Sequence, residues 1–226
     1  MGRRLTTPKA AAFAGIVFAV LLTTTWVLLR LSIPEDIRDS GDWMIAHGDR
    51  VEMALWLVPF AGIAFLWFIG VVRDRLGALE DRFFSSVLFG SGLLFLAMTF
   101  IATSLAGALI STYRADPQVL IDSGVYRLER ENIFRVINVF AVRMAGVFMV
   151  SAATIWFRSG TQPRWLVAFT YLLAGVQLVA LSFSLWLTLV FPIWVLIVSV
   201  NFLVTRPTPD RSVEPDVSEL GADPTG

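Results

Sequence analysis

The forty residues from Trp165 to Val204 read WLVAFTYLLAGVQLVALSFSLWLTLVFPIWVLIVSVNFLV and contain no charged side chain. A single helix of this length would be about 60 Å long, whereas the hydrocarbon core of a bilayer is about 30 Å thick. We therefore expect a tight hairpin of two transmembrane helices, 165–181 and 187–204, with its turn near Ser182–Trp186. Pro192 would then fall in the first turns of the second helix, where proline is tolerated.

Four further apolar stretches are long enough to cross a bilayer, at residues 10–29, 51–72, 83–111 and 136–157. The first follows Arg3, Arg4 and Lys9 as a signal peptide would, but it exceeds the roughly 7–15 apolar residues of a signal core. We expect it to be a retained helix. With the hairpin, the chain is predicted to be an all-α polytopic transmembrane helical bundle of about six spans. Its charged residues make up only 16%, against about 25% in soluble domains.

The ends of the chain differ from the spans. Residues 1–9 are predicted to be a cytoplasmic N-terminus, and residues 205–226 a disordered cytoplasmic tail because they contain almost no apolar residue. Basic residues are denser on the predicted inner side, which places both termini in the cytoplasm. Ten lie there, Arg3, Arg4, Lys9, Arg73, Arg75, Arg82, Arg158, Arg164, Arg206 and Arg211, against seven outside, Arg30, Arg38, Arg50, Arg114, Arg127, Arg130 and Arg135.

Composition also limits the chemistry and the partners of the chain. The formal net charge is zero, so no nucleic-acid partner is expected. The chain has no cysteine and one histidine, His47, which is expected to be an exposed loop residue. No catalytic set, cofactor motif or metal site is predicted. The predicted partners are the lipid bilayer and either a second copy of the chain or another membrane protein. Because only Lys9 among the 18 basic residues is lysine, we expect a bacterial plasma membrane.

The two long predicted outer loops share a pattern. Pro34, Asp39-Ser40-Gly41 and Trp43 have the same spacing as Pro117, Asp122-Ser123-Gly124 and Tyr126. One interpretation is an ancient duplication of a helical hairpin. The other is that each proline starts a short surface helix and each Ser-Gly pair stops it.

The second of these loops also contains residues that predict a charged helix face. Arg127, Glu131 and Arg135 recur every fourth residue, which predicts a solvated face with a favourable glutamate-to-arginine pair. The fourth helix is therefore expected to begin before its apolar part.

Arg143 is the one charged residue inside the fourth predicted span, 136–157, and lies roughly 10 Å below its outer end. A charge at this depth is costly and needs a partner, for which Glu52 is the candidate. One interpretation is a structural arginine clamped to a carboxylate or to carbonyls, and the other is an anion-attracting or gating charge in a polar cavity. Gln177 and Asn201 are mid-span amides that could bond each other across the hairpin or line a polar path.

The C-terminal half resembles a group of uncharacterised multi-pass membrane proteins from actinobacteria. The resemblance rests on Arg143-Met144-Ala145, on Pro163-Arg164-Trp165-Leu166 and on Phe191-Pro192-Ile193-Trp194-Val195-Leu196. It covers roughly the last 60 to 70 membrane residues. It implies the fold and the compartment but no chemistry.

Three functions follow as hypotheses. The first is a non-catalytic accessory or assembly subunit, favoured by small-residue pairs typical of helix packing, such as Ser86 with Gly90 and Thr103 with Gly107. The second is a small-solute or ion transporter or channel, which predicts that Arg143, Gln177 and Asn201 face one hydrated cavity. The third is a membrane enzyme, which predicts that the loop carboxylates of Asp39, Asp42 and Glu52 converge in one pocket.

Overall fold

The computed structural model describes residues 7–34, 36, 39, 41–76, 82–179 and 187–204. Within them every regular element is a helix, and five helices are long and apolar enough to cross a membrane. The predicted all-α polytopic bundle is confirmed. The helices are α1 (Thr7–Ser32), α2 (Trp43–Leu76), α3 (Arg82–Ala115), α4 (Pro117–Asp122), α5 (Val125–Arg135), the π-helix η1 (Val136–Ala141), α6 (Val142–Ser159), α7 (Arg164–Val179) and α8 (Leu187–Val204).

The five long apolar segments lie in α1, α2, α3, the continuous helix formed by α5, η1 and α6, and α8. The remaining predicted span, 165–181, corresponds to α7, which is apolar but has only 16 described residues. The predicted turn near Ser182–Trp186 and the predicted tail 205–226 lie outside the described residues. Pro192 lies inside α8, in its second turn, as expected.

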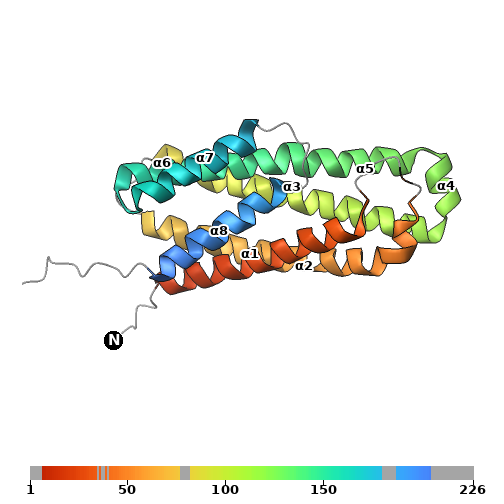
Figure 1. Cartoon of the computed structure of the whole chain (residues 1–226), viewed down its shortest axis with the longest axis horizontal. Helices are drawn as coiled ribbons and strands as arrows, with labels where there is room; N and C mark the ends of the chain where they lie inside the picture. The colour runs from red at the N-terminus through yellow and green to blue at the C-terminus, as the bar shows by residue number, and fades with distance from the viewer. Residues whose placement is uncertain are drawn as a thin grey trace, which may run out of the picture.

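The bundle is elongated, and its two ends differ (Figure 1). The start of α1 and the end of α8 lie at one end, α4 lies at the other, and α7 and α8 occupy the half away from α4. With 34 residues each, α2 and α3 are about 51 Å long, which exceeds the hydrocarbon thickness by about 20 Å. Part of this excess, residues 43–50 at the start of α2, lies at the α4 end. We call this end the α4 cap, comprising the described residues of 33–52 and 113–130.

The second helix begins earlier than predicted. Its apolar part starts at Val51, but α2 starts at Trp43, because the Gly41 and Asp42 carbonyls accept bonds from the first amides of the helix. Gly41 has a φ of 82°, a conformation that favours glycine. His47 is therefore a half-buried helical residue, and the prediction that it lies exposed in a loop was wrong.

The other loop behaves as the start-and-stop interpretation predicts. Pro117 begins α4, Asp116 caps it by accepting a 3.1 Å bond from the Val119 amide, and the helix ends at Asp122 with Ser123 as its C-cap. Gly124 follows with a φ of 73°. The early start of the fourth helix is also confirmed, since α5 begins at Val125 and runs without a break into η1. The Glu131–Arg135 pair predicted on its face forms, at 2.6 Å.

The half of the bundle away from α4 has an aromatic core. Phe65 of α2 stacks on Phe18 of α1 at 4.5 Å and meets Phe191 of α8 edge-on at 5.5 Å. A close approach at Gly15 makes this packing possible, because a Cβ there would lie 2.0 Å from the Ser199 Oγ and 2.8 Å from a Phe68 ring carbon. By contrast, a Cβ at Gly90 or Gly107 would meet nothing within 4 Å. The predicted small-residue pairs containing these two glycines are therefore not helix contacts within the described chain.

Candidate functional site

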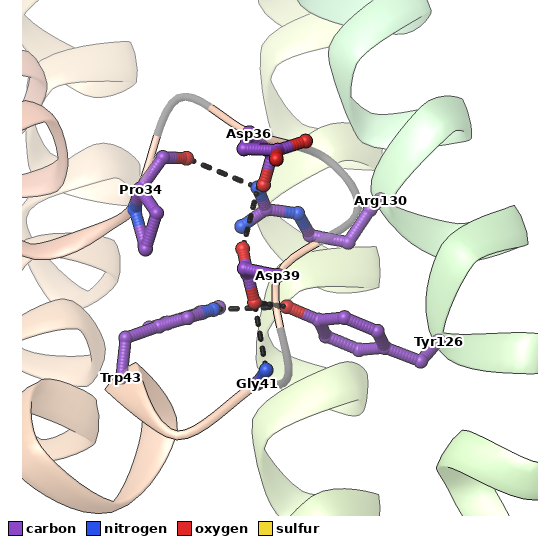
Figure 2. A network of polar contacts seen from close by, with 7 residues as sticks. All are labelled: Pro34, Asp36, Asp39, Gly41, Trp43, Tyr126 and Arg130. Atoms are coloured by element: carbon purple, nitrogen blue, oxygen red, sulfur yellow. Dashed lines mark hydrogen bonds and ion pairs between the residues drawn. The ribbon is translucent and has the colours of Figure 1, made fainter.

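A buried arginine holds the α4 cap together (Figure 2). Arg130 projects from α5, and its Nη2 donates to the carbonyls of Pro34 at 3.0 Å and Asp36 at 3.1 Å. The same nitrogen lies 3.2 Å from the Asp39 carboxylate. The side chain of Arg130 is 8% exposed and that of Asp39 is 15% exposed. The pair therefore joins α5 to a segment more than ninety residues earlier in the chain.

Two aromatic side chains complete this network. The Trp43 indole N–H donates to the Tyr126 hydroxyl at 3.0 Å, and that hydroxyl donates to Asp39 Oδ1. The Gly41 amide donates to the same carboxylate oxygen at 2.7 Å. The Arg130 guanidinium lies over both rings, 5.7 Å from the Trp43 centroid and 5.9 Å from the Tyr126 centroid. Trp43 and Tyr126 are the two aromatic residues at equivalent places in the repeated loop pattern, so the two loops meet through them.

A second polar cluster lies on the surface of the cap. Arg114 of α3 binds Asp49 and Glu52 of α2, the latter at 2.9 Å. All three side chains are exposed, so water competes for them and each pair adds about 0–1 kcal/mol to stability. This cluster ties α2 to α3 without forming an enclosed site.

Between the cap and the aromatic core lies a cavity of about 150 Å³. It is bounded by one face each of α1, α2, α3 and the α5–η1 helix, and by Thr188 in the first turn of α8. Trp43, Pro34 and Arg130 of the cap network line it, as does Arg30 from the last turn of α1. Most of the remaining lining is apolar and includes Leu29, Leu55, Val58, Ala102, Ala106, Leu109, Ile133 and Ile137.

Among the described residues, α8 lines the cavity only with Thr188 in its first turn, and it packs along α1 in the half of the bundle away from α4 (Figure 1). Small side chains on α3, at Ala102, Thr103 and Ala106, add to the space. The cavity therefore lies where the hydrocarbon-length part of the bundle gives way to the cap.

The helices around the cavity depart from regular α-helical hydrogen bonding. Pro59 of α2 and Pro192 of α8 have no N–H for the carbonyls of Leu55 and Thr188, and both of these residues line the cavity. Ile137 and Asn138, also in the lining, belong to the π-helix η1. Helices inside membranes tolerate such irregular backbone mainly where it lines a cavity or is buried in protein, and π-helical turns often occur at functional sites.

A smaller cavity of about 10 Å³, roughly the volume that a single water needs, lies next to the first. The two share Trp26, Ile137 and Thr188 in their linings. Gln177 of α7 faces the smaller cavity, is 1% exposed, and has no hydrogen-bond partner for either amide atom among the described residues. A buried water bound to this amide would satisfy it.

The structure separates the other residues singled out from the sequence. Arg143 donates to the Val139 carbonyl of its own helix at 2.8 Å, whereas Glu52 binds Arg114. The predicted Arg143–Glu52 pair is therefore wrong. The reason is that the Arg143 side chain turns back toward the N-terminus of its helix and that Arg114 lies closer to Glu52. Arg143 and Asn201 do not line either described cavity, so they do not share one with Gln177.

The loop carboxylates are also divided. Asp39 binds Arg130 and Tyr126, whereas Glu52 binds Arg114. They do not form a common bonded cluster, and in the described residues no group of three acidic, histidine or cysteine side chains could hold a metal ion. The convergence required by the enzyme hypothesis is not found.

The sequence analysis did not predict the residues that form the buried network of this site. Arg130 was one of seven basic residues counted in the outer segments, with nothing to distinguish it. The repeated loop pattern contained the available signal, because it placed Trp43 and Tyr126 at equivalent positions.

Fold and site together define a polytopic helical membrane protein with a cavity beneath a polar cap. Comparisons with protein-family models, curated proteins and solved structures gave no match.

Proposed function

We propose that this chain is a non-catalytic membrane protein that binds an amphiphilic molecule in the cavity beneath the α4 cap. The observation that carries the proposal is the cavity itself, about 150 Å³ with mostly apolar walls. An apolar cavity of this size in a protein interior stays dry and binds molecules as large as benzene. In this chain the cavity lies beside a core whose rings pack as closely as 4.5 Å.

The position of the cavity favours an amphiphile over a purely apolar molecule. Its lower wall is apolar and lies at the start of α8, while its upper wall contains Arg30 and Arg130. A molecule with a polar head and an apolar tail would match both walls. Because α2 and α3 are about 20 Å longer than the hydrocarbon core is thick, we infer that the upper wall lies near the level of the lipid headgroups.

Transport is the weaker alternative. It would require a polar path through the bundle, and of Arg143, Gln177 and Asn201 only Gln177 lines a described cavity. An enzymatic function has less support, since Asp39 and Glu52 bind different arginines. Binding requires only the cavity and is consistent with an accessory or assembly role.

The proposal includes a location and an orientation. The excess of arginine over lysine supports a bacterial plasma membrane, and the distribution of basic residues supports cytoplasmic termini. The start of α1 and the end of α8 lie together (Figure 1), as that orientation requires. The α4 cap would then face the outside and the bound amphiphile would come from the outer leaflet.

The test is photolabelling of the purified protein in nanodiscs with an octanol that carries a diazirine. We expect labelled peptides from the cavity walls of α1 and α3, with labelling that saturates. Ala106→Phe fills the cavity from α3 and should abolish the saturable labelling. Ala108→Phe is the matched control, because Ala108 lies on the same helix, is exposed and does not line the cavity.

Two results would count against binding in this cavity. One is labelling that rises linearly with probe concentration, and the other is an equal loss of labelling in both variants. Either would mean that the probe reports lipid-facing surface alone.

A further inference from the structure

We propose that the amphiphile has an uncharged head whose oxygen accepts a hydrogen bond from Arg130, as the oxygen of an alcohol, an ether or a ketone can. This inference rests on the proposed function and adds the chemical class of the ligand. It follows from a juxtaposition in the upper wall of the apolar cavity, where a buried donor without an acceptor belongs to an ion pair that already balances its charge.

The hydrogen bonds of Arg130 are unevenly divided between its two terminal nitrogens. Nη2 donates to the Pro34 and Asp36 carbonyls and lies beside the Asp39 carboxylate. Nη1 is buried and has no hydrogen-bond partner among the described residues. The side chain of Arg130 is 8% exposed and lines the cavity. A buried N–H group is costly to leave unpaired, so an oxygen acceptor on the ligand would complete the hydrogen bonding of the guanidinium.

The positive charge of Arg130 already has its counterion. Asp39 Oδ2 lies 3.2 Å from Nη2, and the side chain of Asp39 is 15% exposed. Arg30, the other charged residue in the described lining, has an interaction of its own. A further charge brought beside a neutral buried pair would have no counterion, and such a charge is costly to remove from water. The ion pair therefore favours an uncharged head.

The network around Arg130 keeps the guanidinium in place. Trp43 and Tyr126 contact its face, and the two loop carbonyls hold Nη2 (Figure 2). A preorganised donor of this kind loses little conformational freedom when the ligand arrives. The apolar tail of the ligand would lie against walls such as those formed by Leu55 and Ala102.

The experiment measures displacement of the octanol photolabel in nanodiscs of zwitterionic lipid by octanol, by nonane and by octyl phosphate. Nonane has as many non-hydrogen atoms as octanol but no acceptor, and octyl phosphate has a charged head. All three are compared at equal mole fractions in the lipid, so that differences in partitioning do not enter. Octanol should displace the label at a mole fraction at least about tenfold lower than nonane, because a hydrogen bond to a charged group is worth about that factor or more. Octyl phosphate should be less potent than octanol.

Two results would overturn the inference and leave the proposed function intact. Equal potency of octanol and nonane would show that the cavity binds by its apolar walls alone. Octyl phosphate at least as potent as octanol would show that the site accepts an anionic head. Both comparisons use the unsubstituted protein, so they do not depend on the folding of any variant.

Variants of the cap then test whether Arg130 is the donor. Arg130→Met keeps an unbranched side chain but removes every donor, so it should retain the label and lose the preference for octanol over nonane. Arg114→Gln removes a positive charge from the same cap, outside the cavity, and should keep that preference. An undiminished preference in Arg130→Met would contradict the assignment.

A third variant tests the role of the counterion. Asp39→Asn leaves the guanidinium in place and removes the charge that balances it, so the potency of octyl phosphate relative to octanol should rise about tenfold or more. A merely structural role for the pair predicts that the order of the three competitors stays the same. An unchanged order in Asp39→Asn would therefore overturn the inference.

Discussion

The aromatic core and the α4 cap are two halves of one bundle held together by different forces. In the core, α1, α2 and α8 meet through rings such as Phe18, Phe65 and Phe191, packed at 4.5–6.0 Å. In the cap, α5 is held against the loop before α2 mainly by Arg130, Asp39 and Tyr126. The cavity lies between the two.

The difference follows from the solvent around each half. Lipid tails are as apolar as the side chains, so helices inside a bilayer associate through close fit rather than through exclusion of water. Past the hydrocarbon, charged groups can approach from water and be buried in pairs. The core therefore depends on shape and the cap on a few polar bonds, and the two should respond differently to substitution.

The largest effect is expected in the cap. Arg130→Leu removes the positive charge that pairs with Asp39 and the donor of two loop carbonyls, and breaking a buried pair in this way costs about 3–5 kcal/mol. We expect a loss of this size in the free energy of unfolding, measured by detergent denaturation of the purified protein. Arg135→Leu is the control, because Arg135 is exposed and its ion pair within the described residues is with Glu131 of its own helix. Similar losses in both variants would show that the buried pair does not hold the cap.

A smaller effect is expected in the core. Gly15→Ala places a methyl group 2.0 Å from the Ser199 Oγ and 2.8 Å from the Phe68 ring, and overpacking of this kind costs about 1–3 kcal/mol. Gly90→Ala meets nothing within 4 Å and should leave stability unchanged or slightly increased. The thermal midpoint of both proteins in the same detergent measures the difference. Equal thermal midpoints for the two variants would show that close packing at Gly15 does not limit the stability of the core.

The smallest effect is expected on the surface of the cap. Arg114→Gln removes the exposed bonds to Asp49 and Glu52, which together should cost about 1 kcal/mol. Because salt screens exposed charges over about 3 Å at 1 M, the difference from the unsubstituted protein should vanish at high salt. A loss that persists in 1 M salt would mean that the Arg114 cluster is buried against another surface.

Much of the fold was predictable from local sequence. Charge-free runs of about 20 residues identify spans because a bilayer excludes unpaired charges, and the five long apolar helices overlap the predicted ones. Helix ends were less predictable. Residues 43–50 are helical because the carbonyls of Gly41 and Asp42 accept the first hydrogen bonds of α2. Hydropathy does not predict where a helix begins in this way.

The candidate site was much less predictable, and the two arginines show why. Arg143 was conspicuous because it interrupts an apolar run, yet among the described residues its side chain bonds to the Val139 carbonyl, one turn away on its own helix. Arg130 was inconspicuous among polar neighbours, yet it is buried and contacts residues more than ninety positions earlier. Whether a charged side chain is buried depends on which distant segments pack together. The spacing of residues along the sequence does not predict that packing.

The sequence by itself determined that this chain is a multi-pass helical membrane protein, because the cost of charge and of unpaired backbone in lipid restricts each segment independently. Only the tertiary structure determined where a cavity lies between the helices. Among the described residues, the cavity lies between the first turn of α8 and the cap, where Ala102 and Ala106 present small side chains and Arg130 closes the upper wall. Those facts belong to different helices, and only their packing brings them together.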